Sequence, residues 1–287
     1  MYCRAVVVTL AIGMAALPAA TQAYDIKPKT PESAFSAKLH PDILGISADS
    51  TAESARTIFE SFFKGRLDAK TDIQQQKFGN TAISFVTALS YSLPPGPGQN
   101  GEMLSSSFTS PASANRVYFI ARNLTFAKDQ QPAKADMIKE VMGKYGAPTI
   151  VGDQRLYYIY RSGAIVSAGT KYKEATALDA IDKPLDPRTA LKLNGETIRG
   201  SCVAVVKRAP TREKTLDAML DDARGANCDG VLSVQLIPGA APDRVAIAQF
   251  SLLDVKRVIS AAAIDNDAAA AEQSERNPVP KGSAPKL

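Results

Sequence analysis

The side chains of this sequence best suited to covalent chemistry are three cysteines and one histidine. Cys3 lies in an N-terminal segment that we expect to be removed, which leaves Cys202 and Cys228 as a pair. Cys202 directly precedes one predicted strand, Cys228 lies shortly before the next, and a predicted helix separates them. If the two strands are parallel neighbours, both cysteines lie at one edge of the sheet, within reach of a disulfide bond. A redox pair is the alternative, but neither a C-x-x-C spacing nor a histidine partner is present. We therefore predict a structural disulfide between Cys202 and Cys228.

The single histidine, His40, excludes every site that needs two, such as H-E-x-x-H or a two-histidine zinc site. His40 precedes Pro41 and Asp42 in a segment without an apolar pattern. As a base it would need a positioned nucleophile, which the sequence does not indicate. We therefore expect a solvated histidine, no catalytic residue and no metal site.

Residues 96–101, Gly-Pro-Gly-Gln-Asn-Gly, match the letters of the dinucleotide-binding motif G-x-G-x-x-G. That motif needs its last glycine to open a helix whose N–H groups meet the pyrophosphate. Here the residues that follow, 102–109, are serine-rich and strand-like. We interpret the segment as an exposed hairpin loop and expect no cofactor.

Aromatic and basic side chains gather at two places that could contact a partner. In the predicted strand 155–160, Tyr158 and Tyr160 share one face and Tyr157 lies on the other. Tyrosine and arginine are enriched at interfaces, but core packing of the tyrosines and solvation of the basic residues are the plainer alternatives. The candidate partner surface consists of Tyr157, Tyr158, Tyr160, Arg161, Lys207 and Arg208.

The composition is that of an ordinary folded chain, with 287 residues, 45% hydrophobic, 22% charged and a formal net charge of +5. These values exclude disordered, collagen-like and polytopic membrane classes. Loss of Arg4 with the N-terminal segment leaves +4, spread along the chain. We therefore expect no nucleic-acid partner.

Residues 1–23 have the features of a secretory signal peptide. Arg4 and the amino terminus supply positive charge, an uncharged run follows over residues 5–17, and Pro18 ends it. Small residues precede the predicted cleavage between Ala23 and Tyr24. The run is shorter than the roughly 20 residues of a membrane span. We expect an exported protein, periplasmic or secreted, without a transmembrane segment in the mature chain.

The remaining chain is predicted to be α+β, with an antiparallel meander sheet and helices packed on one face, followed by a smaller disulfide-linked β-α-β-β unit. A helix over 51–63, with Ser50 and Glu53 as its capping box, opens the first unit. Strands follow over 82–93, 102–109 and 116–126, then a helix over 134–145 and a strand over 155–160. The second unit comprises strands over 203–206, 231–237 and 245–253, a helix over 211–224 and a terminal helix over 254–264.

The predicted organisation is therefore a signal peptide (1–23), an extended linker (24–41), an α-β-β-β-α-β domain (42–169), a connecting segment (170–200), a second α/β unit (201–264) and a disordered tail (265–287). Proline-rich or unpatterned composition defines the linker and the tail. Whether 42–264 forms one domain or two stays open.

An export signal, a packed core, one disulfide and no catalytic constellation favour a non-enzymatic binding or envelope accessory module. Its partner would be an unknown protein or envelope component. Two alternatives stay open, namely a hydrolase or transferase that uses Ser, Lys, Asp or Glu without histidine, and a secreted effector that acts on a host partner. The sequence does not determine the ligand or the oligomeric state.

Overall fold

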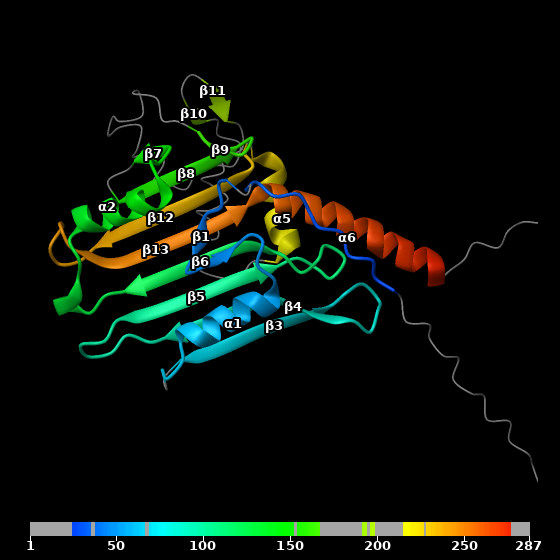
Figure 1. The fold of residues 1–287 in the computed structure, drawn as a ribbon, viewed down its shortest axis with the longest axis horizontal. Coiled ribbons are helices and arrows are strands. Elements are labelled where there is room, and N and C mark those ends of the chain that lie inside the picture. The colour runs from blue at the N-terminus through cyan, green and yellow to red at the C-terminus, as the bar shows by residue number, and fades with distance from the viewer. Residues whose placement is uncertain are drawn as a thin grey trace, which may run out of the picture.

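One large antiparallel sheet dominates the fold (Figure 1). The structure is a computed structural model that describes residues 25–35, 38–66, 69–151, 154–166, 191–193, 196–198, 215–226 and 228–276. The sheet runs in the order β3 (Lys70–Lys77), β4 (Ser84–Leu93), β5 (Gly101–Phe108), β6 (Val117–Thr125), β13 (Val245–Asp254), β12 (Gly230–Pro238), β8 (Arg155–Arg161) and β7 (Ile150–Val151). The mixed α+β class with a large antiparallel sheet is thereby confirmed.

The smaller elements complete the described chain. β9 (Ala164–Ile165) pairs with β8. Two hairpins form separate two-stranded sheets, β1 (Asp42–Ile43) with β2 (Ile46–Ser47) and β10 (Leu191–Leu193) with β11 (Glu196–Ile198). The helices are α1 (Ala52–Phe62), α2 (Lys134–Tyr145), α5 (Leu216–Gly225) and α6 (Val255–Arg276), with a short 3-10 turn at Lys128–Gln130.

Strands that the sequence suggested for two successive units are hydrogen-bonded into this one sheet. β13 pairs with β6, from Ile247 opposite Thr125 to Leu253 opposite Phe119. β12 then lies between β13 and β8. A central position suits β6, because its first residues are buried on both faces. The predicted strand 203–206 and most of the connecting segment lie outside the described residues.

Helices cover both faces of the sheet. α1 and α2 share one face, as expected for the first unit, whereas α5 and α6 cover the opposite face. The core under α1 and α2 includes Phe59, Leu89, Val141, Tyr158 and Leu232. The core under α5 and α6 includes Phe119, Tyr157, Met219, Val231 and Val258.

α1 begins one residue later than predicted, and its capping box is shifted by one residue as well. Thr51 is the N-cap, since its hydroxyl accepts the N–H of Ser54 at 3.2 Å and the Ser54 hydroxyl accepts the N–H of Thr51 at 2.8 Å. The prediction of Ser50 with Glu53 is therefore wrong. The Ser50 hydroxyl instead accepts the N–H of Ser47 at 3.2 Å, inside the preceding turn.

α6 continues well beyond its predicted end at residue 264. The prediction of disorder from residue 265 is wrong as far as Arg276, because an alanine-rich stretch favours helix and two contacts fix it. Asp265 accepts hydrogen bonds from the hydroxyls of Ser110 and Ser113, at 2.6 and 2.7 Å. Arg276 donates to the carbonyl of Asn80, between β3 and β4, at 2.5 Å.

Residues 25–35 form an extended segment beside α6 (Figure 1). Asp254, which precedes α6, accepts the hydroxyl of Ser33 at 2.6 Å and the N–H of Ala34 at 3.0 Å. Residues 1–24, and with them the predicted signal peptide, lie outside the described residues. None of the helices described is long and apolar enough to cross a membrane.

Candidate functional site

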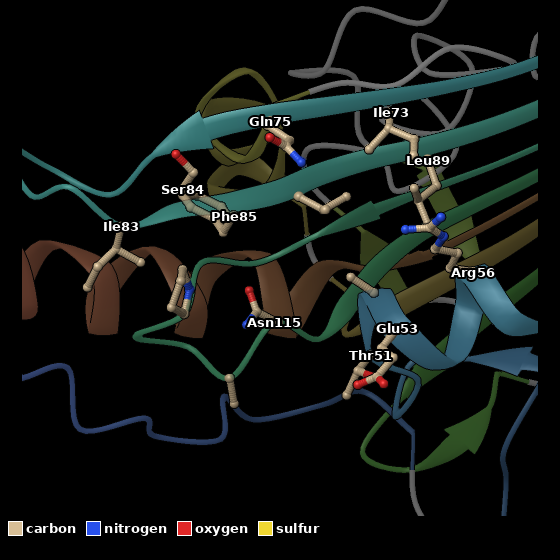
Figure 2. Close-up of a pocket in the computed structure, with 14 residues that line it drawn as sticks. Thr51, Glu53, Arg56, Ile73, Gln75, Ile83, Ser84, Phe85, Leu89 and Asn115 are labelled. Carbon is tan, nitrogen blue, oxygen red and sulfur yellow. The ribbon is translucent and has the colours of Figure 1, made fainter.

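A groove of ≈ 660 Å³ lies between α1 and the outer strands of the sheet (Figure 2). We call it the α1–β3 groove. It combines side chains from the start of α1, from β3, from β4 and its approach, and from the β5–β6 loop. Its lining residues are Thr51, Ala52, Glu53, Arg56, Ile73, Gln75, Ile83, Ser84, Phe85, Val86, Leu89, Pro111, Ala114 and Asn115.

Cross-strand pairs of β3 and β4 form the floor of the groove. Ile73 lies opposite Leu89, and Gln75 lies opposite Val86. The register shifts between Gln74 and Gln75, which makes a bulge at this point. Leu89 also belongs to the core under α1 and α2. The floor is thus continuous with the core.

The rim of the groove is polar. Figure 2 shows Thr51, Glu53 and Arg56 on the α1 side, across from the β3 and β4 side chains. Arg56 donates from Nε to Glu60, one helical turn later, at 2.7 Å. This i, i+4 pair holds the guanidinium along the helix surface. The rim can therefore offer one positive and one negative side chain to a ligand, from Arg56 and Glu53.

The β5–β6 loop closes the third side of the groove in a strained conformation. Ala114 and Asn115 have φ of 64° and 49°, in the left-handed region. The N–H of Asn115 donates to the carbonyl of Ser110 at 2.9 Å. Because Ser110 also binds Asp265 of α6, the loop is anchored to the opposite face of the sheet.

The groove can recognise a ligand by apolar contact and hydrogen bonding. Its lining contains neither histidine nor cysteine. The described residues contain no group of three or more His, Cys, Asp or Glu placed to hold a metal ion. Apolar floors with a few convergent polar groups are typical of ligand-binding clefts.

β3 forms one lateral boundary of the groove and lies at the end of the large sheet. It pairs with β4 on one side, and no second neighbour occurs among the described strands. All eight of its residues are exposed. An edge strand presents backbone N–H and C=O groups along its outer side. The groove therefore lies beside the outermost strand of the sheet as described.

The three tyrosines predicted as a partner surface lie in the core, and this part of the interpretation is wrong. Tyr157, Tyr158 and Tyr160 are each at most 1% exposed. The predicted alternation of the tyrosines between the two faces of the strand was correct, because Tyr158 and Tyr160 pack in one core cluster and Tyr157 packs in the other. Both faces of β8 are covered, however, so neither set reaches the surface.

Two of the buried tyrosine hydroxyls have polar partners. Tyr158 donates to the carbonyl of Gly146 at 3.1 Å, and Arg155 donates to the Tyr157 hydroxyl at 3.1 Å. Burial raises the pKa of Tyr158 to about 12 and also raises the pKa of Tyr160. Both phenols therefore stay protonated at neutral pH.

The remaining predicted site residues are divided between the described and undescribed parts of the chain. Arg161 is half-buried at the end of β8. Cys228 is buried just before β12. Cys202, Lys207 and Arg208 lie outside the described residues, so the disulfide and the basic cluster stay predictions.

His40 lies near a serine and an aspartate but does not form a catalytic relay with them. Its Nε2 is 3.0 Å from the Ser47 hydroxyl and 3.3 Å from the Asp49 carboxylate. In a relay the two ring nitrogens contact different partners. Here one nitrogen serves both, so the cluster is a local polar contact beside β2.

The residues of the α1–β3 groove were not identified from the sequence as a site. The segment 70–77, Lys-Thr-Asp-Ile-Gln-Gln-Gln-Lys, has one large apolar residue and no alternating pattern, so it was not predicted as a strand. A run of polar residues directly before the strongly alternating strand 82–93 is the only signal that could have indicated an exposed edge partner.

In comparisons with protein-family models, with curated proteins and with solved structures, no match was found for this chain. The geometry of the groove and of its edge strand is therefore the basis of the functional assignment.

Proposed function

We propose that this chain is an exported, non-enzymatic binding module, and that the α1–β3 groove receives side chains of its partner. One observation carries the proposal, namely an apolar-floored groove that lies directly beside a fully exposed edge strand. A partner at this place can bury apolar side chains and add backbone hydrogen bonds. Rigid floors reduce the ordering cost of such binding.

The exposure of the floor supports a binding role. Ile73 is 37% exposed although it lies in the same cross-strand pair as the buried Leu89. An apolar side chain at a groove edge gains by being covered, at roughly 25 cal/mol per Å² of apolar surface removed from water. The polar rim residues Glu53 and Arg56 would then fix the orientation of the partner.

Export and the disulfide belong to the same proposal. The signal-like segment over 1–23 would deliver the chain to an oxidising compartment, where Cys202 and Cys228 would pair. Cys228 is positioned just before β12, so the bond would tie the undescribed segment around Cys202 to the central sheet. Thiol titration of the unreduced, denatured mature chain should detect no free thiol, and two free thiols would contradict the pairing.

A display experiment tests the binding role. A phage library of random linear peptides is selected on the mature protein, and enriched peptides are measured against two matched variants, Ile73→Glu and Ile259→Glu. Ile73 and Ile259 are similarly exposed, at 37% and 41%, but only Ile73 lines the groove.

The proposal predicts enriched peptides that lose at least about tenfold in affinity with Ile73→Glu and retain it with Ile259→Glu. Such a loss is expected because a charge in the groove must be desolvated when an apolar side chain covers it. The proposal is overturned if no peptide is enriched, or if the enriched peptides bind both variants equally well.

A further inference from the structure

The two edges of the large sheet differ in a way that singles out β3. One edge ends in β7, which has two residues, and β9 caps part of β8 beside it. The other edge ends in β3, which has eight residues, all exposed. Short edge strands prevent unwanted pairing, whereas a long exposed strand is a template for it. β3 is thus the long pairing edge among the described strands.

We propose that β3 accepts an added strand from an extended partner segment that carries carboxylates at both ends. This inference rests on the proposed function, because the side chains of the added strand would enter the α1–β3 groove. Addition of a strand to a sheet edge obtains affinity from backbone hydrogen bonds and specificity from alternate side chains.

The alternation of β3 directs the added side chains. Ile73 and Gln75, two residues apart in β3, line the groove, whereas the intervening face includes Gln76, which lines a smaller cavity of ≈ 200 Å³ together with Asp265 of α6. Partner residues directly opposite Ile73 and Gln75 would therefore lie over the groove. Apolar residues at these two positions would cover the exposed side of Ile73.

The charges of β3 define the ends of the partner. Lys70 and Lys77 stand at the two ends of the strand, and residues 73–76 between them are uncharged. Asp72 is the one acidic residue of the strand. Opposite charges in directly facing positions stabilise a strand pair and like charges destabilise it. An antiparallel partner of matching length would place its first and last residues opposite Lys77 and Lys70, where carboxylates fit best.

The same charges disfavour a second copy of this chain as the occupant. When two β3 strands pair antiparallel over their full length, Lys70 of each copy faces Lys77 of the other. One repulsive lysine pair at each end of the interface then opposes association. The edge is therefore better suited to a different, acidic-ended segment.

Two synthetic peptides test the inference directly. The first, E-T-V-T-V-T-V-E, has glutamates at its ends and valines at the positions that would face the groove. The second, K-T-V-T-V-T-V-K, differs only at its ends. Both are measured by calorimetry at about 50 mM salt, where surface charges are weakly screened, against the wild-type chain and against the double variant Lys70→Glu with Lys77→Glu.

The wild-type chain should bind the glutamate-ended peptide at least about 2-fold more tightly than the lysine-ended peptide. Two attractive cross-strand charge pairs contribute about 2- to 30-fold, and the lysine-ended peptide replaces this attraction by repulsion. The double variant should invert this preference. Because Lys70 and Lys77 are both exposed, the melting temperature of the double variant should stay close to that of the wild type. An unchanged preference in the double variant, or no binding of either peptide to the wild type, would overturn the inference.

The outcome separates this inference from the proposed function. If library peptides depend on Ile73 but ignore the charge reversal, the groove binds a partner without strand addition at β3, and only the present inference fails. If Ile73→Glu also has no effect on any selected peptide, the binding role of the groove fails as well.

Discussion

Ile73 and Leu89 face each other across the outermost strand pair of the sheet, yet Leu89 is 1% exposed and Ile73 is 37% exposed. Leu89 belongs to the core under α1, and Ile73 lies at the open side of the same groove. One cross-strand contact thus joins a structural residue to a residue that is available to a partner. Substitutions at the two positions should have different consequences.

Truncation of Leu89 should destabilise the fold far more than truncation of Ile73. Leu89→Ala should lower the free energy of unfolding by about 2–5 kcal/mol, because it leaves a cavity in the core. Ile73→Ala should lower it by less than about 1 kcal/mol, because much of the side chain is already hydrated. Urea unfolding measures both. An equally large loss at Ile73 would show that Ile73 is part of the core rather than a binding residue.

The sequence predicted much of the sheet but not its outer edge. Residues 82–93 alternate cleanly, so β4 was identified, whereas β3 is solvated on both faces and carries no hydrophobic pattern. The pairing of β13 with β6 joins residues more than 100 positions apart, and local patterns do not encode such partners. Alternation in strand 155–160 correctly assigned its tyrosines to opposite faces of the sheet. It could not show that helices cover both faces, because the helices α5 and α6 that cover the face of Tyr157 come much later in the chain.

A buried arginine supports the start of α1, and its loss should destabilise the protein strongly. Arg257 is 1% exposed and donates to the carbonyls of Ala48 and Val117. It also lies near two carboxylates, at 3.4 Å from Asp49 and 3.7 Å from Asp254. Arg257→Met would leave the buried Asp254 without its cation, at a cost of about 3–5 kcal/mol.

An exposed arginine provides the control for this measurement. Arg56 pairs with Glu60 on the surface of α1, so Arg56→Met should leave the melting temperature close to that of the wild type. Thermal unfolding of both variants would check the contrast. A loss at Arg257 as small as the loss at Arg56 would contradict the supporting role of the buried arginine.

The buried carboxyl of Asp265 should make stability depend on pH. Burial raises the pKa of Asp265 above its ordinary value of 3.8, although hydrogen bonds from Ser110 and Ser113 act in the opposite direction. Between 3.8 and the raised value, the folded state binds more protons than the unfolded state. Stability from this group is therefore present below pH 3.8 and decreases as the pH rises through that window.

Asp265→Asn should remove this decrease and keep the oxygen that accepts both serine hydroxyls. The melting temperature of the variant relative to the wild type should rise as the pH increases through the window. Melting curves from about pH 3.5 to pH 7 measure the difference. A difference that stays constant or falls with increasing pH would contradict the raised pKa.

Reversal of a single charge on β3 should promote self-association. With Lys77→Glu, antiparallel pairing of two β3 strands would place a glutamate opposite Lys70 at both ends, which replaces repulsion by attraction. Sedimentation should show more dimer for this variant than for the wild type. The double variant Lys70→Glu with Lys77→Glu restores like charges and should return to the wild-type behaviour. Identical sedimentation of the single and double variants would contradict the pairing geometry.

Hydrogen exchange with and without the glutamate-ended peptide tests the central claim most directly. Strand addition at the groove predicts slower exchange of the backbone amides over residues 70–77, together with protection around residues 83–89. The amides of β7, at the opposite edge of the sheet, should exchange at unchanged rates. Protection at β7 or α2, with none over residues 70–77, would contradict the claim that the α1–β3 groove and its edge strand are the binding site.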